Sequence, residues 1–323
     1  MLSAPKRAAF EARAENDIYW SDRYYTNGMR FTYTSEEVFT KALPVVLRDL
    51  FAISPLAART AAEPVAYRWH LSATHEFYTP FYEHDTTPPA GDHPYAGLLY
   101  GTLGFSSETA RRLDTLELGI GVLGPSARAG QVQNWWHAVI DVKESGGWHT
   151  QLRDEPYVQL AWTRVARYRW LDAPGLELDW LPRVRLEAGT VRDYAQVGMQ
   201  WRVGYGLPKD FGTSTLHGAN ALVRPGTEAE YTAPLHWAPD AAFIFLDAQF
   251  DAKGRDARLD GNLWRDNSPS VRRNPWVGQV TLGFFVRWGA VGIEIAEVMR
   301  TNEFRGQKNG YFNYTTAALR VVF

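Results

Sequence analysis

Two side chains that could act together in catalysis lie in QVQNWWHAVI, residues 131–140: Gln133 and His137. Because they are four residues apart, one helical turn would place both on the same face. A histidine titrates near neutral pH and can act as a general base, and a polar partner can orient its ring. A histidine between tryptophans could equally belong to an aromatic girdle. The spacing therefore suggests an acid–base site and does not by itself establish one.

A second group of polar residues lies near the N-terminus, in AENDIYW (14–20) and DRYYTNG (22–28). Carboxylate, amide and hydroxyl oxygens held close together suit a hard cation such as calcium. Alternatively, they form an internal polar network that satisfies its own hydrogen bonds. No EF-hand, HExxH, GxSxG or P-loop motif accompanies them. The side chains concerned are Glu15, Asn16, Asp17, Asp22, Thr26 and Asn27.

The composition narrows the class of protein that could position these groups. The 323 residues include no Cys, 45% are hydrophobic, and the net charge is -2. These values exclude a disordered chain and a disulfide scaffold, and they give no sign of nucleic-acid binding. No window approaches the roughly 20 apolar residues of a membrane-spanning helix. The N-terminus lacks the apolar core of a secretory signal, so we expect either a cytosolic protein or a mature chain behind an added Met1.

The dominant pattern is the alternation of apolar with polar or small residues at period two, which is typical of β-strands. In VGMQWRVGYGLP, for example, Met199, Trp201 and Val203 alternate with Gln200 and Arg202. A doubtful stretch near 255–264 is assigned to a loop. The predicted strands are 12–19, 28–35, 67–77, 95–107, 112–123, 156–169, 177–191, 196–207, 241–252, 275–288, 290–303 and 310–323.

About twelve strands of this length favour one particular all-β fold. A soluble sandwich uses shorter strands, whereas an outer-membrane barrel needs an even number of strands of about ten residues, apolar outside and polar inside. The last strand, YTTAALRVVF, ends on the aromatic Phe323. We therefore predict one transmembrane antiparallel β-barrel over residues 1–323. With both termini periplasmic, segments 20–27, 78–94 and 124–155 would lie on the cell-surface side.

One segment does not fit a short periplasmic turn. In residues 35–54, SEEVFTKALPVVLRDLFAIS, the apolar residues recur at helical spacing and the first three residues make a plausible helix start. The sequence predicts a periplasmic helix here. The helix could plug or cap the barrel, or it could lie on the inner leaflet.

Six blocks of sequence occur in a characteristic order and spacing: END (15–17), DRYYTNG (22–28), YTP (78–80), GDHPYAG (91–97), LGPSARAGQVQNWWH (123–137) and GWHTQL (147–152). Together they resemble the lipid A 3'-O-deacylase family of Gram-negative outer membranes, and the resemblance covers essentially the whole chain as a twelve-stranded barrel. It implies a calcium-dependent hydrolase that removes the 3'-linked acyloxyacyl chain from lipid A of lipopolysaccharide at the outer rim, in the bacterial outer membrane.

Site residues follow from this resemblance position by position. The Asn-Asp pair of the family falls on Asn16 and Asp17, which are therefore expected to hold the metal. Its hydroxyl residue falls on Thr26, and its Gln and His fall on Gln133 and His137.

Two positions depart from the pattern of the family. Lys143 stands where the family has an acidic residue, so the neighbouring Glu144 is the provisional substitute. A lysine of the third-strand loop has no counterpart in FYEHDTTPPAGDHP, residues 81–94. The acyl-chain or headgroup preference could therefore differ from that of other members.

The expected mechanism is water attack on the ester, with His137 as the base and Gln133 or a nearby carboxylate orienting its ring. Calcium would polarise the carbonyl, while Asn16 and Thr26 donate to the oxyanion or hold the ion. A serine or threonine nucleophile stays open.

The surroundings of these residues lead to further expectations. Trp135, Trp136 and Trp148 would lie where acyl chains meet headgroups. Outer-membrane lipids surround the barrel, which we expect to be monomeric. The alternatives are a passive pore or a purely structural barrel, although bulky inward polar residues favour a filled lumen. Arg23, Arg128, Lys143 and Arg153 could contact lipid A phosphates or simply be solvated.

Overall fold

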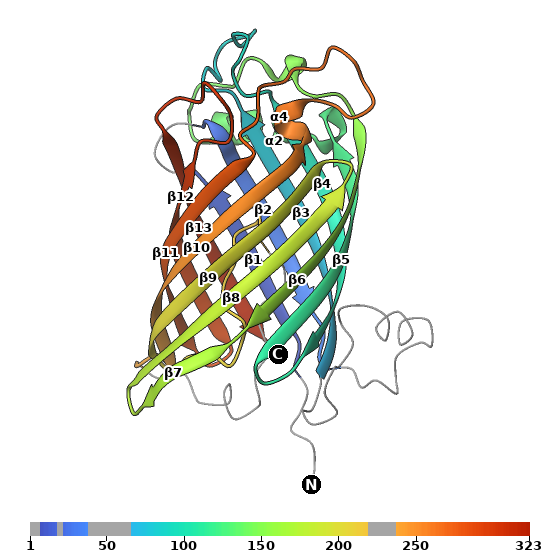
Figure 1. Cartoon of the computed structure of the whole chain (residues 1–323). Coiled ribbons are helices and arrows are strands. Elements are labelled where there is room, and N and C mark those ends of the chain that lie inside the picture. Colours follow the sequence, from blue (N-terminus) through green and yellow to red (C-terminus); the bar gives the residue numbers. More distant parts are fainter. Residues whose placement is uncertain (1–6, 18–21, 38–65, 219–236) are drawn as a thin grey trace.

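In the computed structural model, twelve antiparallel strands close into a tilted barrel (Figure 1). The structure describes residues 7–17, 22–37, 66–218 and 237–323. Each strand of the ring pairs with the next one along the chain, except that β6 pairs with β8 and not with the short β7, and β1 pairs with β13 to complete the ring. The strands are β1 (Ala9–Asn16), β2 (Tyr24–Thr34), β3 (Ala66–Thr79), β4 (Ala96–Glu108), β5 (Arg112–Leu123), β6 (Glu155–Ala166), β7 (Tyr168–Ala173), β8 (Leu176–Gly189), β9 (Arg192–Tyr205), β10 (Ala241–Asp256), β11 (Trp276–Trp288), β12 (Val291–Thr301) and β13 (Tyr311–Val322).

The alternation along each strand sorts side chains between the two faces of the wall. On β5, Leu118 and Ile120 point outward and are 43% and 61% exposed, whereas Glu117 points into the lumen and is 2% exposed. The same division recurs around the ring and confirms the predicted transmembrane barrel. Among the described helices, none has the length and apolar content to cross a membrane.

The structure adds detail that the sequence patterns did not predict. β7 is a thirteenth, short strand that pairs only with the first part of β8 and extends the hairpin beyond the barrel wall. The loop expected near 255–264 contains a single helical turn, α4 (Ala257–Asp260), whose first amides are capped by the Asp256 carboxylate. The predicted helix at 35–54 lies, from residue 38 onward, outside the described residues.

Ion pairs and polar side chains fill the lumen. Gln200, Arg202 and Arg287 are at most 9% exposed, which confirms the expected filled interior. Arg13 lies 2.9 Å from Glu294, and Arg185 lies 2.5 Å from Glu117. Removing such charges from water is costly unless each one meets a partner, so the arginines and carboxylates of facing strands hold one another in place. In this respect the structure does not favour a passive pore.

The connection after β9 also enters the lumen, a feature that the sequence did not reveal. Residues 206–218, here called the luminal segment, pass inside the wall (Figure 1). Its Thr213 accepts a hydrogen bond from Gln200 at 2.8 Å. Farther along, the Leu216 amide donates to Glu15 at 2.8 Å. The segment therefore joins β9 to the first strand of the barrel.

A lipid-facing charge should destabilise this fold in proportion to its depth in the bilayer. Leu118 lies midway along β5, and Leu118→Arg is expected to lower the free energy of unfolding by about 2–4 kcal/mol. The measurement is urea unfolding in lipid vesicles. Trp170→Arg is the control, because Trp170 is 71% exposed on β7, beyond the main wall. Equal losses for the two variants would contradict the assignment of the outer face of β5 to lipid.

Candidate active site

The strand ends and loops that carry the predicted site residues lie at the end of the barrel opposite the C-terminus, where β1, β2 and β3 meet their loops (Figure 1). Asn16 ends β1, and its amide nitrogen donates to the Thr26 carbonyl at 3.2 Å. On β2, the pairing with β3 shifts between Tyr25 and Asn27, so Thr26 is the extra residue of a β-bulge. Bulges re-aim a side chain locally and are frequent beside active sites. Here the bulge directs the buried Thr26 toward β3.

Hydroxyl groups tie the first loop to β3. The Thr26 Oγ1 lies 2.7 Å from the Thr79 Oγ1. Thr79 in turn donates to the Asp22 carbonyl, so Thr26 must act as the donor in the first bond. Both hydroxyls are inaccessible to solvent. This relay fixes the backbone of Asp22, which adopts a left-handed conformation with φ 39°.

The loop between β5 and β6 supplies the helix α2 (Ala129–Val139), as the spacing of Gln133 and His137 predicted. The first turn of α2 packs so tightly on β4 that a Cβ at Gly97 would lie 2.6 Å from the Ala129 Cβ. Below it, His75 Nε2 lies 2.7 Å from the Ala127 carbonyl oxygen. These contacts hold the helix against the rim of the barrel.

Opposite faces of α2 have different surroundings. Gln133 and His137 are buried, at 4% and 3% exposure. On the other face Trp135, Trp136 and Val139 are all more than half exposed. The helix therefore turns its polar pair toward the barrel and a broad apolar surface away from it.

His137 joins the two loops through both ring nitrogens. Its Nε2 lies 2.5 Å from the Asp22 Oδ2, and its Nδ1 lies 2.8 Å from the Lys143 carbonyl oxygen. Because a carbonyl can only accept, Nδ1 must carry a proton. Nε2 then faces the Asp22 carboxylate across a hydrogen-bonding distance. The nitrogen that can exchange protons is thus Nε2.

Gln133 has a different partner from the one expected. Its Oε1 accepts a hydrogen bond from the Trp148 Nε1 at 2.8 Å, which fixes the orientation of the amide. The Gln133 Nε2 is buried without a hydrogen-bond partner among the described residues. Among the described residues, Gln133 and His137 form no hydrogen bond with each other. Gln133 is therefore placed as a donor and does not orient the imidazole.

Trp148 corrects one expectation. The sequence predicts it at the lipid boundary together with Trp135 and Trp136, but it is only 8% exposed. Its ring packs on Tyr95 with the ring centroids 4.9 Å apart, and a Cβ at Gly130 would lie 2.6 Å from it. Its indole nitrogen is used inside the protein, so Trp148 supports α2 from within.

Glu144 is exposed, and no described contact brings it to His137. The ring is instead held by the backbone carbonyl of Lys143, the position where the family has its acid. A carbonyl oxygen accepts from Nδ1 whatever the side chain, so a lysine at this position does not remove the orienting bond. A catalytic role for Glu144 stays a prediction.

Oxygen donors suited to a cation surround the ends of β1 and β2. Asp17 is buried, and its Oδ2 accepts from the Arg23 amide at 2.8 Å. Nearby on β2, the Asn27 Oδ1 is buried without a hydrogen-bond partner in the described chain. Asn16, opposite Asn27 in the strand register, adds an amide oxygen. Within the described ranges no three His, Asp or Glu side chains form a metal cluster, so an ion here would depend on amide and backbone oxygens as calcium does.

Charged groups of the neighbouring loop border the site. The Arg23 guanidinium lies 4.1 Å from the centre of the Phe81 ring, and its Nε lies 3.9 Å from Glu83. Burial raises the pKa of the Glu83 carboxyl, and the nearby His84 and Arg23 oppose this shift. Arg23, predicted as a possible phosphate contact, therefore already has an aromatic and an acidic neighbour.

Two residues of the site were not identified from the sequence as working groups. Asp22 was noted only as one oxygen among several, and Thr79 was part of the block YTP. Their contacts, Asp22 with His137 and Thr79 with Thr26, cross between loops and strands far apart in sequence. The only available signal was their position inside the two quoted blocks.

Comparisons with known proteins identify the family and the fold of the chain. The sequence model of the family described as outer membrane protein LpxR matches residues 3–323. LpxR from Salmonella typhimurium superposes with a TM-score of 0.73 at 18% identity, over 98% of this chain and 100% of that one, a similarity that shows the fold. The β-domain of the Bordetella autotransporter BrkA gives a TM-score of 0.42 at 9% identity, over 98% of each chain. A search of curated protein sequences gave no match.

The Thr79 hydroxyl should be needed to hold the first loop. Thr79→Val removes the donor to the Asp22 carbonyl and the acceptor of Thr26, which should cost about 1–3 kcal/mol locally. We expect faster amide hydrogen exchange in residues 22–27, measured by mass spectrometry.

Ser72→Ala is the matched control for this measurement. Ser72 lies on the same strand, and its buried hydroxyl has no hydrogen-bond partner in the described structure. Its removal should leave the exchange of residues 22–27 unchanged. If Thr79→Val also leaves exchange unchanged, the hydroxyl relay does not hold the loop.

Proposed function

The chain belongs to the LpxR family of outer membrane proteins, and we propose that its loop-end site hydrolyses the 3'-linked acyloxyacyl ester of lipid A, with His137 as general base. Family membership makes the protein a lipid A deacylase, a hydrolase of the bacterial outer membrane, and implies 3'-O-deacylation. The observation that carries the mechanism is the fixed imidazole. Its Nδ1 is held by a carbonyl, while its Nε2 faces the junction of α2 and the first loop.

The proposed reaction uses one water molecule and one ester. Nε2 of His137 takes a proton from water while the water oxygen bonds to the ester carbonyl carbon. The tetrahedral intermediate then breaks its bond to the sugar oxygen, which receives that proton from the imidazolium. The products are a free acyloxyacyl acid and a 3'-hydroxyl. For water to reach Nε2, the Asp22 carboxylate must move aside. Alternatively, it can move back far enough to accept a hydrogen bond from that water.

Donors around the site could stabilise the oxyanion. The buried Gln133 Nε2 has no described partner, so it can donate without breaking an existing bond. Asn16 and Thr26 lie on the opposite strands, where their present bonds connect β1 to β2 and β2 to β3. Prepositioned donors of this kind are worth a factor of about 10²–10³ each in similar reactions. An alternative in which the Thr26 hydroxyl attacks would require it to release Thr79 and would leave an acyl-enzyme.

The oxygen donors described above fit calcium, and we propose Asp17 and Asn16 as ligands, with the Asn27 oxygen as a third donor. Calcium bound there would act as a Lewis acid on the ester carbonyl. The role of the protein is to hold these oxygens at fixed positions relative to one another. The bond from Asn16 to the Thr26 carbonyl and the bond from the Arg23 amide to Asp17 do this.

The position of α2 explains how a lipid could reach the site from the membrane. Trp135, Trp136 and Val139 are exposed on α2, and Leu99 and Ile120 are exposed on β4 and β5, the two strands that lead to this end of the barrel. Amphipathic aromatic rings favour the boundary between headgroups and acyl chains. Lipid A in the outer leaflet would thus present its ester at the level of His137. We propose that the protein works as a monomer, since all the groups invoked belong to one chain.

Replacing the base should slow turnover strongly while leaving the barrel intact. For His137→Ala we expect a loss of about 10²–10⁴ in kcat, the usual contribution of a general base. The measurement is mass spectrometry of lipid A after incubation with purified protein, with and without calcium. Chelation should also suppress release of the acyloxyacyl acid by the unmodified protein.

Gln131→Ala serves as the control, because Gln131 is exposed on the same helix and should be dispensable. Unchanged lipid A with the unmodified protein in calcium would remove the proposed function. Full activity of His137→Ala would keep the enzyme and overturn the assignment of its base. An acyl adduct on Thr26 would replace direct water attack.

Glu144 provides a separate test of what orients the imidazole. If the Lys143 carbonyl holds Nδ1, Glu144→Gln should change kcat by no more than about twofold. Steady-state kinetics on lipid A would show this. A loss comparable to that of His137→Ala would mean that the carboxylate of Glu144, and not the carbonyl, is the working group.

A further inference from the structure

The luminal segment, residues 206–218, ends beneath the candidate active site. Three strands supply hydroxyl or amide groups to that site, and in each strand the residue directly before the site residue is buried, at 0 or 1% exposure. All three of these preceding residues contact the tip of the luminal segment. The pairs of preceding and site residue are Glu15 with Asn16, Tyr25 with Thr26, and Tyr78 with Thr79.

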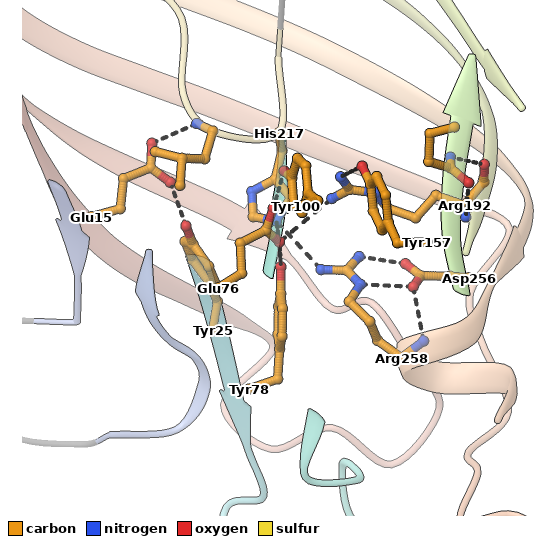
Figure 2. A network of polar contacts seen from close by, with 12 residues as sticks. Glu15, Tyr25, Glu76, Tyr78, Tyr100, Tyr157, Arg192, His217, Asp256 and Arg258 are labelled. Atoms are coloured by element: carbon orange, nitrogen blue, oxygen red, sulfur yellow. Dashed lines mark hydrogen bonds and ion pairs between the residues drawn. The ribbon is translucent and has the colours of Figure 1, made fainter. Parts of the chain in front are cut away.

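The contacts involve two consecutive residues of the segment, Leu216 and His217, and Figure 2 shows His217 close to Tyr78. The Leu216 amide donates to Glu15 Oε1 at 2.8 Å, and Tyr25 donates to the other oxygen of that carboxylate at 2.9 Å. His217 Nε2 lies 2.8 Å from the Tyr78 hydroxyl oxygen. Its ring meets Tyr25 edge-on, with the ring centroids 4.7 Å apart. One dipeptide thus touches all three strands.

Gly28, the last residue of the block DRYYTNG, makes room for this packing. A Cβ at Gly28 would lie 1.9 Å from the Tyr25 hydroxyl oxygen and 2.8 Å from the Leu216 side chain. Any larger residue would therefore displace both the tyrosine and the tip. The strand that carries Thr26 is shaped to receive the luminal segment.

The tip is also supported from the far side of the lumen. Arg258 of α4 approaches His217 Nε2 to 3.3 Å and is itself held by the Asp256 carboxylate. Figure 2 shows that Tyr78 and Arg258 both approach His217. Lower in the segment, Thr213 is bonded to Gln200 on β9 and has no described contact with the three site strands. The segment therefore spans the lumen from the wall of β9 to the floor of the site.

We propose that Leu216 and His217 are positioning residues of the deacylase: they brace β1, β2 and β3 from inside the barrel and so set the relative placement of Asn16, Thr26 and Thr79. This proposal rests on the proposed function. The brace acts through Glu15, Tyr25 and Tyr78 and touches no substrate atom. A displacement of about 1 Å in a catalytic group can cost about 100-fold in rate, so a support of this kind has a measurable effect.

The deciding variant is His217→Ala, compared with Thr213→Val in the same segment. For His217→Ala we expect kcat on lipid A to fall by about 10- to 100-fold with KM within about twofold, because the outer binding surface is unchanged. Hydrogen exchange in residues 22–27 and 76–80 should become faster. Thr213→Val should leave kcat and exchange at the site strands as they are. His217→Gln retains a polar atom for the Tyr78 hydroxyl and should recover most of the rate.

Two results would overturn the brace. One is unchanged exchange at the site strands in His217→Ala, and the other is an equal loss of kcat in Thr213→Val, which would indicate general filling of the lumen. Hydrogen exchange is measured on the protein alone and does not depend on its enzymatic activity. If the unmodified protein does not hydrolyse lipid A, the proposed function fails, and exchange alone still decides whether the segment braces these strands.

Discussion

Every arginine placed inside the closed barrel has to meet a carboxylate, because the ring of strands removes it from bulk water. Arg202, which is completely buried, meets two: Asp179 on β8 and Asp210 in the luminal segment. The second contact fixes the start of that segment to the wall, and its tip then reaches the strands beneath the site. Charge pairing in the lumen therefore anchors a connection that begins at one end of the barrel, so that its tip can contact the strands at the other end.

The site itself combines rigid and adaptable parts. Asn16, Thr26 and Thr79 lie at strand ends whose registers are fixed by the sheet, whereas Asp22 and Lys143 reach His137 from loops. Binding and catalytic residues are often found on loops that a scaffold holds in place. The imidazole is consequently oriented by the backbone carbonyl of Lys143 on one side and by the side chain of Asp22, which can change its rotamer, on the other. This division would suit the general base that we propose for His137, because such a base has to admit water.

The strands could be predicted because lipid and lumen impose opposite requirements on alternate residues, and this leaves a period-two pattern in the sequence. Gln133 and His137 could be placed on one face because helical spacing is local. The contact of Asp22 with His137, the bond of Trp148 to Gln133 and the course of residues 206–218 could not be predicted. Each of them joins segments whose proximity depends on closure of the whole sheet. Glu144 illustrates the same limit, since a side chain was expected where a backbone carbonyl lies.

The luminal segment also restricts the order of assembly. Its contacts run to β9 through Gln200, to α4 through Arg258 and to the first strand through Glu15. A segment held by contacts on several sides of a lumen filled with ion pairs is enclosed most simply while the sheet is still open. Pairing of β1 with β13 would then trap it. A barrel that closed with the segment outside would lack the contacts beneath Asn16, Thr26 and Thr79.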